Sequence, residues 1–295
     1  MNMEETSAFF GSFEEYDRAD SLGEIQTIHD SSGGYTVLGK ARMNGTLVAL
    51  KWLKPEYSGN PFYERMLRKE YEIGNGLDHP NICPVLDFFR VPELGNCIVM
   101  RWIDGESLER LIGSEGLPVR KIVLELCDAL EYLHRKQIIH RDLKPSNVLI
   151  TNNGQNVKLI DFGLSDADWY TVLKNPAGTK DYISPEQLAG ETVDCRSDIY
   201  SLGKIMLRMQ AYPRIAAVCS REDRGRRFRD IAGVRSAIIR RETFRRWWLP
   251  SALAILLMLV VSFLLIRPSF KAVSDRRAVD SVFERLTEEI RDAAY

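Results

Sequence analysis

The first hundred residues carry several short runs rich in apolar and β-branched positions, separated by turn residues, which is typical of strands. Between about residues 25 and 53 two such runs, YTVLGKA and LVALKWL, flank the turn RMNGT, whose Asn44-Gly45 pair is a strong hairpin signal. Two further runs, VLDFFRVP at 85–92 and NCIVMRWI at 96–103, have the same character. We therefore predict an antiparallel hairpin followed, further along the chain, by two more strands.

Two other stretches place apolar residues at helical intervals. In residues 60–76 the apolar residues stand among alternating charges, and Gly74 and Gly76 end the pattern. These apolar residues are Phe62, Met66, Leu67 and Ile73. Beyond Gly105 a longer apolar face follows, formed by Leu117, Ile122, Leu126, Leu130 and Leu133. The change of period near residues 101–105 predicts an α+β fold in which a small β-rich lobe precedes a helical lobe.

One segment departs from the pattern of a soluble protein. Residues 247–266, WWLPSALAILLMLVVSFLLI, contain no charge over 20 residues, and about 20 apolar residues span the roughly 30 Å hydrocarbon core of a bilayer. The alternative is a buried core helix. Arg245 and Arg246 before the run, and Arg267 and Lys271 after it, favour a single transmembrane helix with its tryptophans at the interface.

The distribution of basic residues indicates the orientation of this helix. Seven lie in residues 227–246 and five in residues 267–286, a bias that favours the N-terminal side inside. The first 20 residues are acidic and lack a basic stretch followed by an apolar run, so they do not resemble a secretory signal. We expect a single-pass membrane protein with a cytoplasmic N-terminal part and an extracytoplasmic tail.

The tail, residues 267–295, has a helical apolar pattern of its own. Its members are Val279, Val282, Phe283, Leu286 and Ile290. This spacing predicts a short amphipathic helix. Its apolar face is available to a partner or to a second copy, so homo-oligomerisation through the membrane helix or the tail stays open.

Composition restricts the partners further. The chain has 295 residues, with 40 Lys plus Arg against 41 Asp plus Glu and a net charge of −1, which provides no global field for nucleic acid. We predict no nucleic-acid partner. Its five cysteines are scattered without a C-x-x-C pair, which is typical of reduced cysteines in the cytosol and predicts no metal site made from them.

The stretch IHDSSGGYTVLGKA, residues 28–41, has the glycines of a phosphate-binding hairpin, yet serine or threonine stands at some positions where such loops place glycine. Glycine-rich turns also simply close hairpins. The stretch alone leaves both interpretations open.

Four separate motifs resemble the protein kinase family, and together they cover about residues 25–242. They are VALK at 48–51, HRDLKPSN at 140–147, DFG at 161–163 and SPE at 184–186. The resemblance implies a bilobal protein kinase fold with a β-rich N-lobe and a helical C-lobe. It also implies ATP and Mg²⁺ as cofactors.

The roles that the resemblance implies suit phosphoryl transfer, in which catalysis consists mostly of positioning and of cations that neutralise developing charge. Lys51 would contact the α and β phosphates, with Glu70 as its partner. Asp142 would accept the proton of the substrate hydroxyl, and Lys144 would neutralise the γ-phosphate. The metal ligands would be Asn147 and Asp161.

In the glycine loop, aligning Ala41 with the alanine that ends the family's motif puts Ser31, Gly33 and Thr36 at the three glycine positions and Tyr35 at the hairpin tip. Gly33 stands where backbone amides most need to approach the phosphates, so we expect a working but less mobile loop. The other residues implied to contact ATP are Leu38, Ala49 and Leu149 around the adenine, Met100 at the gate, Arg101 and Ile103 in the linker, and Glu106 near the ribose.

Several positions depart from the family pattern. Gly74 stands where a large apolar residue normally packs against Phe162 and His140, which predicts a loosely docked helix. Arg101 replaces an acidic linker residue. After Asp198, which should brace the catalytic loop, the chain is shortened and lacks the helix often used for substrate docking. Arg227 remains available to pair with Glu186.

The substrate class follows from DLKPSN, which resembles Ser/Thr kinases. Thr179, in the motif AGTKDY, is implied to support the substrate platform, and Thr171 is a candidate for autophosphorylation. A kinase domain followed by one membrane helix resembles the transmembrane Ser/Thr kinases of bacteria. The alternative is a membrane-tethered scaffold that binds nucleotide without transferring phosphate, motivated by Ser31, Thr36 and Gly74.

These expectations divide the chain into five parts. They are an N-terminal extension at 1–24, a kinase domain at 25–242, a basic juxtamembrane segment at 243–246, a transmembrane helix at 247–266 and the tail at 267–295.

Overall fold

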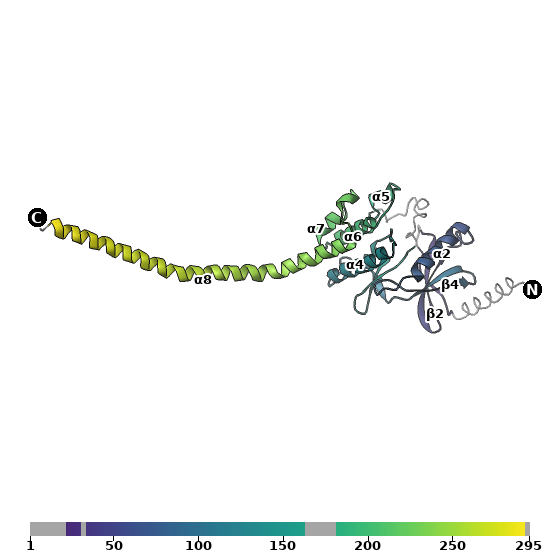
Figure 1. Ribbon diagram of the computed structural model, residues 1–295. Helices are drawn as coiled ribbons and strands as arrows, with labels where there is room; N and C mark the ends of the chain where they lie inside the picture. Colours follow the sequence, from purple (N-terminus) through teal and green to yellow (C-terminus); the bar gives the residue numbers. More distant parts are fainter. Residues whose placement is uncertain (1–21, 31–33, 163–180, 293–295) are drawn as a thin grey trace, which may run out of the picture. The chain divides into compact units, whose positions relative to one another are not determined.

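The computed structural model describes residues 22–30, 34–162 and 181–292. The chain separates into two units, Met1–Ile238 and Ile239–Tyr295. The first unit holds the two lobes, and the second is the greater part of one long helix (Figure 1).

The N-lobe is built on a five-stranded antiparallel sheet in the order β1-β2-β3-β5-β4. Its strands are β1 (Gln26–Asp30), β2 (Thr36–Met43), β3 (Thr46–Leu53), β4 (Val85–Val91) and β5 (Gly95–Arg101). Asn44 and Gly45, with φ of 50° and 78°, form the turn between β2 and β3. Positive φ at both positions is what a two-residue hairpin turn of this hand requires, so the predicted hairpin is confirmed.

Helix α2 (Pro61–Asn75) lies against β4 and β5 (Figure 1). It begins where the Asn60 side chain accepts a hydrogen bond from the Phe62 amide, with Pro61 in the first turn, and it ends at Gly76. The face that meets the sheet carries Met66, Leu67, Glu70 and Gly74, all of them buried. The predicted helix is confirmed, except that Gly74 lies inside it.

Two cores fill the N-lobe. The larger lies on one side of the sheet and contains Val37, Ala41, Val48, Leu50, Trp52, Phe89, Val91, Cys97 and Val99. The smaller lies beneath α2 and has only three fully buried members, Leu53, Leu67 and Ile98.

The C-lobe is mainly helical. Its elements are β6 (Gly105–Ser107), α3 (Leu108–Leu111), α4 (Val119–Arg135), η1 (Pro145–Asn147), β7 (Val148–Thr151), β8 (Val157–Leu159), α5 (Pro185–Leu188), α6 (Arg196–Arg208), α7 (Pro213–Cys219) and η3 (Arg224–Arg226). The apolar face predicted for α4 is confirmed, because Ile122, Leu126, Leu130 and Leu133 are fully buried. Leu117 precedes the helix.

Past α6 the described chain offers one seven-residue helix, α7, before η3, in agreement with the predicted shortening. Helix α8 (Ile231–Asp292) then runs without a break through the rest of the described chain. Its first two turns bury Ile231, Val234 and Ile238 in the C-lobe core. The predicted boundaries at 242, 246 and 266 all fall inside α8 and stay predictions.

A stretch of α8, Ile231–Leu264, is long and apolar enough to cross a membrane, with a mean hydropathy of 2.2 in its most apolar window. In the second unit the apolar side chains of residues 253–264 are exposed. The five apolar residues predicted to form one face of the tail lie on the same helix and are also exposed, with 51% of Leu286 and 73% of Phe283 accessible.

Candidate active site

A buried ion-pair network joins β3, α2 and Asp161, which follows the end of β8 by two residues. The Lys51 ammonium donates to both oxygens of Glu70, at 2.6 and 2.8 Å, and to Oδ1 of Asp161 at 2.9 Å. Lys51 and Glu70 are almost inaccessible, whereas the Asp161 side chain is 37% exposed. The network therefore opens to solvent only on the Asp161 side.

Burial and neighbouring charges shift both members of this pair. Burial alone would lower the pKa of Lys51, but Asp161 and Glu70 outweigh it and raise that pKa. Burial raises the pKa of Glu70 to about 7, against the opposing effect of the Lys51 ammonium. Lys51 therefore stays charged, and Glu70 titrates near neutral pH.

Asp142 presents one free carboxylate oxygen. Its Oδ2 accepts hydrogen bonds from Lys144 Nζ at 2.6 Å and from Asn147 Nδ2 at 3.0 Å, and the same amide nitrogen donates to the Asp142 carbonyl at 2.9 Å. Its Oδ1 is buried and has no hydrogen-bond partner among the described residues. Burial raises the pKa of Asp142, opposed by Lys144. A buried acceptor of this kind is suited to taking a proton from a hydroxyl.

Asp198, on α6, holds the loop that carries Asp142. Its carboxylate accepts from the backbone amides of His140 and Arg141, both at 2.9 Å, and lies 2.7 Å from His134 Nε2. Burial would raise the pKa of Asp198, but the hydrogen bond to His134 and the nearby histidines lower it. These bonds support Arg141 at a φ of 63°, so the bracing role predicted for Asp198 agrees with the structure.

The space beside Gly74 is filled by Val85 of β4. A Cβ added to Gly74 would lie 2.5 Å from Val85 Cγ2 and 4.0 Å from Phe162 Cδ2. Phe162 is buried and its ring centroid lies 5.5 Å from that of His140. The predicted loose docking of α2 is therefore wrong: glycine lets the helix backbone approach β4, and Val85 supplies the apolar contact.

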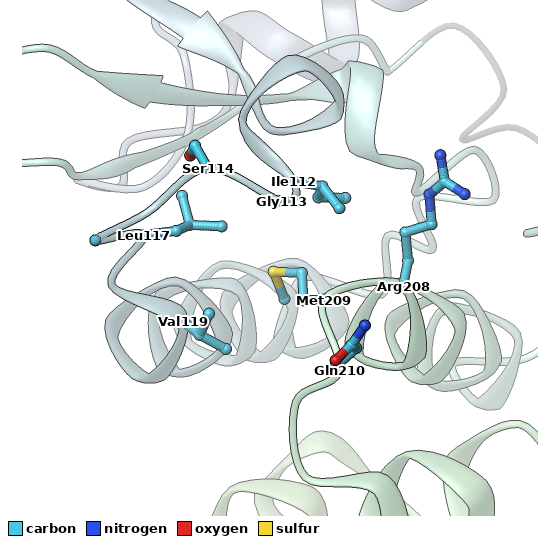
Figure 2. Close-up of a pocket in the computed structure, with 9 residues that line it drawn as sticks. Ile112, Gly113, Ser114, Leu117, Val119, Arg208, Met209 and Gln210 are labelled. Carbon is cyan, nitrogen blue, oxygen red and sulfur yellow. The ribbon is translucent and has the colours of Figure 1, made fainter.

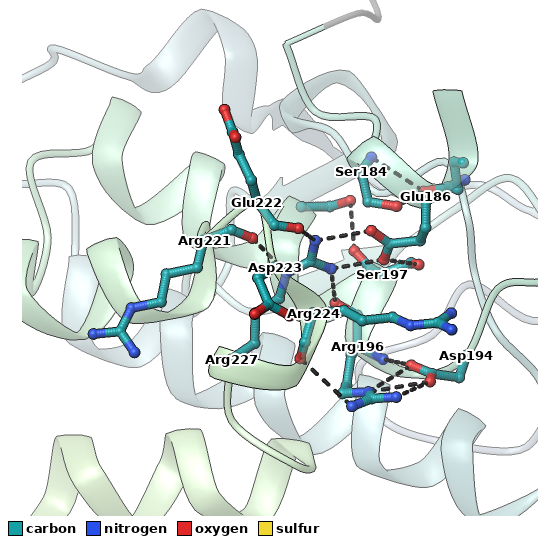
Figure 3. A network of polar contacts seen from close by, with 12 residues as sticks. Ser184, Glu186, Asp194, Arg196, Ser197, Arg221, Glu222, Asp223, Arg224 and Arg227 are labelled. Atoms are coloured by element: carbon teal, nitrogen blue, oxygen red, sulfur yellow. Dashed lines mark hydrogen bonds and ion pairs between the residues drawn. The ribbon is translucent and has the colours of Figure 1, made fainter. Parts of the chain in front are cut away.

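Glu186, at the start of α5, forms a fully buried pair with Arg227. Arg227 donates through Nη1 and Nη2 to the two Glu186 oxygens at 2.6 and 2.8 Å, and Ser197 donates to Oε1 at 2.6 Å (Figure 3). Burial opposes ionisation of Glu186, but these hydrogen bonds lower its pKa to about 2. The predicted pair is present, and Gln187 extends it to the catalytic loop by donating to the Arg141 carbonyl at 2.9 Å.

The residues predicted to surround the adenine lie mainly on strands of the N-lobe sheet, next to the linker at residues 101–105. Leu38, Ala49 and Met100 lie on β2, β3 and β5, with Ala49 paired to Met100 across the sheet. The Arg101 amide donates to the Pro84 carbonyl, which leaves the Arg101 carbonyl as the group that can meet a ligand. Cys83 Sγ donates to this Arg101 carbonyl at 3.5 Å. The remaining predicted contacts are Ile103 in the linker, half-exposed Leu149 on β7, and Glu106, which bonds Arg110 at 3.3 Å.

Four predicted positions lie outside the described residues. They are Ser31 and Gly33 of the glycine loop, and Thr171 and Thr179 of the segment before Tyr182.

Comparison with known proteins agrees with this geometry. A sequence model described as the protein kinase domain matches residues 24–251. The chain belongs to the protein kinase family.

Several curated relatives of this chain come from bacteria. A probable serine/threonine-protein kinase of Streptomyces coelicolor is 38% identical over 181 residues, covering 56% of this chain and 26% of the relative. One from Clostridium perfringens is 37% identical, covering 63% and 28%, and the kinase PknB of Mycobacterium tuberculosis is 36% identical, covering 54% and 27%. The kinase chain thus spans about a quarter of the length of these relatives.

Solved structures support the fold. The kinase domain of PknI from Mycobacterium tuberculosis superposes with a TM-score of 0.57 at 23% identity, covering 75% of this chain and 96% of that one. At this identity the likeness concerns the fold alone.

A separate pocket of about 330 Å³ lies in the C-lobe of this kinase, between the loop after α3 and the end of α6 (Figure 2). Its lining includes Ile112, Leu117, Arg208 and Met209. None of the predicted site residues contributes to it, so this pocket is not the site of the chemistry.

Three contributors escaped prediction. His134 is a partner of Asp198, and its only sequence signal is its place six residues before HRD on the α4 pattern. Val85 and Tyr63 act through contacts between distant segments. No spacing of residues along the chain predicts such contacts.

Proposed function

We propose that this protein transfers the γ-phosphate of ATP to serine or threonine hydroxyls of proteins, including its own. One observation carries the proposal: Lys51 is hydrogen-bonded to both Glu70 and Asp161, while Asp142 offers a buried Oδ1 that has no partner in the described part of the chain. The names of the serine/threonine-kinase relatives support the substrate class, as does Lys144 two residues after Asp142.

The chain's own groups would divide the work as follows. Asp142 Oδ1 takes the proton as the substrate hydroxyl attacks, while Lys144 and Asn147 hold Oδ2 and so fix the carboxylate. Lys51 places a positive charge at the α and β phosphates, with its direction set by Glu70. Lys144 neutralises charge that develops on the transferred phosphoryl group.

The donor atoms at the site fit a magnesium ion. Mg²⁺ prefers oxygen ligands and takes few from the protein, keeping its other positions for water and phosphate. Asp161 offers a part-exposed carboxylate, and Asn147 donates through its amide nitrogen to Asp142, which leaves its side-chain oxygen as the ligand. Bound there, the ion would neutralise phosphate charge.

A transfer assay on the full chain in detergent, with Mg²⁺ and γ-labelled ATP, tests the activity. Wild type should incorporate label, whereas Asp142→Asn should lose about 10²–10⁴-fold of the rate, the usual contribution of a general base. Asp78→Asn changes an exposed aspartate that follows the end of α2, so it serves as the matched control and should match wild type. Saturable ATP binding with no transfer in wild type would instead support the nucleotide-binding scaffold.

We further propose that α8 anchors the kinase in the cell membrane as a single-pass protein, with the kinase domain in the cytoplasm, where ATP is, and residues 267–295 outside. The apolar stretch of α8 and the excess of basic residues before it support this orientation. Protease added to protoplasts should shorten the chain only at the tail. Loss of the kinase domain with the tail spared would reverse the topology.

A further inference from the structure

The small core beneath α2 depends on aromatic rings. Only three apolar side chains there are fully buried, and the half-buried residues packed on them include Tyr35, Tyr57, Tyr63, Tyr71 and Phe88. Aromatic pairs stabilise by about 0.5–1.5 kcal/mol beyond the area that they bury. Ring contacts therefore contribute to the position of α2 over the sheet.

Three of these rings form a row that runs from the glycine loop to the helix. The ring centroids of Tyr57 and Tyr63 are 4.6 Å apart at 56°, and those of Tyr35 and Tyr63 are 5.4 Å apart at 40°. Tyr63 lies seven residues before Glu70 and four before Leu67, so the three share one face of α2. A displacement of Tyr63 is therefore passed along the face that carries Glu70.

The backbone fixes Tyr35 at the end of the β2–β3 ladder. Its carbonyl accepts from the Lys54 amide at 2.9 Å, and the Lys54 carbonyl accepts from the Tyr57 amide at 2.9 Å. Tyr57 thus lies at the end of the turn that begins at Lys54, Tyr35 is hydrogen-bonded to Lys54, and both rings contact Tyr63. This arrangement connects the hairpin to the helix independently of the Lys51–Glu70 pair.

We propose that Tyr35 is a positioning residue for the kinase reaction: through Tyr63 it holds α2 where Glu70 meets Lys51. The inference rests on the proposed function for its catalytic consequence, but not for its structural part. It makes Tyr35, which the sequence places at the hairpin tip, a support of α2.

The ring, and not an ionised hydroxyl, performs this role. Burial raises the pKa of Tyr35, and the nearby charges of Glu70, Asp161 and Asp142 act in the same direction against that of Lys51. The hydroxyl therefore stays protonated at neutral pH. Tyr35→Phe keeps the ring and should retain the positioning, whereas Tyr35→Ala removes it.

The test compares Tyr35→Ala, Tyr63→Ala and the double variant in the full chain. Hydrogen exchange of the α2 amides around Glu70 should quicken about three- to tenfold in Tyr35→Ala, which loses one aromatic pair, and by more in Tyr63→Ala, which also loses the pair with Tyr57. The kcat should fall by a similar factor. In the double variant both losses should stay near those of the larger single variant, because the two rings act through one contact. Tyr35→Phe, which keeps the ring, should restore the slow exchange of the α2 amides.

Tyr71→Ala supplies the matched control. Tyr71 also lies on α2, but its ring packs on Phe88, with the two ring centroids 5.2 Å apart. The increases in the exchange rate of the α2 amides caused by Tyr71→Ala and by Tyr35→Ala should multiply when the two substitutions are combined. Unchanged α2 exchange in Tyr35→Ala, or independent effects of Tyr35 and Tyr63, would overturn the proposal. Exchange needs no phosphoryl transfer, so an inactive wild type would refute the proposed function alone.

Discussion

Gly74→Ala is the substitution that most directly tests how α2 is held. Gly74 is buried in the last turn of α2, and the added Cβ would lie 2.5 Å from Val85 Cγ2. Ordinary carbon contacts begin near 3.5 Å, so the overlap is about 1 Å. Valine has few χ1 alternatives on a strand, and Val85 is flanked by the helix and β5. Either the helix or β4 must shift.

The structure gives the sign and approximate size of the effect. Overpacking of this kind costs about 1–3 kcal/mol, while replacing glycine by alanine in a helix interior returns up to about 1 kcal/mol. We therefore expect Gly74→Ala to lower the free energy of unfolding by about 1 kcal/mol net. Glu70 lies one turn before Gly74, so the shift also loosens the Lys51–Glu70 pair and lowers kcat.

A double-mutant cycle in the full chain makes the test decisive. Val85→Ala alone should lower the free energy of unfolding by about 1–3 kcal/mol, because it leaves a cavity. It also removes the methyl group that clashes with the new Cβ at position 74. The double variant should therefore be at least about 1 kcal/mol more stable than the summed losses of the two single variants predict. Urea unfolding followed by fluorescence measures stability, and γ-labelled ATP measures kcat. Gly233→Ala, where the new Cβ would approach no atom closer than 3.4 Å, is the control and should not destabilise. Additive effects of the Gly74 and Val85 variants would refute the packing argument.

Four further outcomes are expected. Because Glu70 titrates near pH 7, its ionised form is lost as pH falls, so kcat should decline from pH 8 to 6, and Glu70→Gln should remove that part of a pH–rate profile. Arg227→Ala leaves Glu186 charged and buried, which should cost about 3–5 kcal/mol in urea unfolding, whereas exposed Arg226→Ala should cost under about 0.5 kcal/mol. Since the folded pKa of Glu186 lies near 2, below its unfolded value, its contribution is complete above about pH 4.5 and is lost toward pH 2, so Glu186→Gln should flatten the acid limb of stability against pH. Mass spectrometry of active protein should find phosphate on Thr171, and an unmodified Thr171 would contradict its regulatory role.

The sequence by itself determined the lobes and predicted which groups react. Alternation of apolar positions and the Asn44-Gly45 turn predict the hairpin, and helical spacing predicts α2 and α4, because these signals depend on neighbours along the chain. The motifs VALK and HRDLKPSN predict Lys51 and Asp142 as functional residues, because phosphoryl transfer requires a cation and a proton acceptor at these positions.

Tertiary structure alone decided how these groups are held. Gly74 on its own suggested a loose helix, and only the approach of β4 shows that Val85 takes the space. His134 on Asp198, and Tyr35 on Tyr63, join segments that no local pattern connects. The physical reason is that packing and buried hydrogen bonds depend on distances across the fold, which the order of residues does not contain.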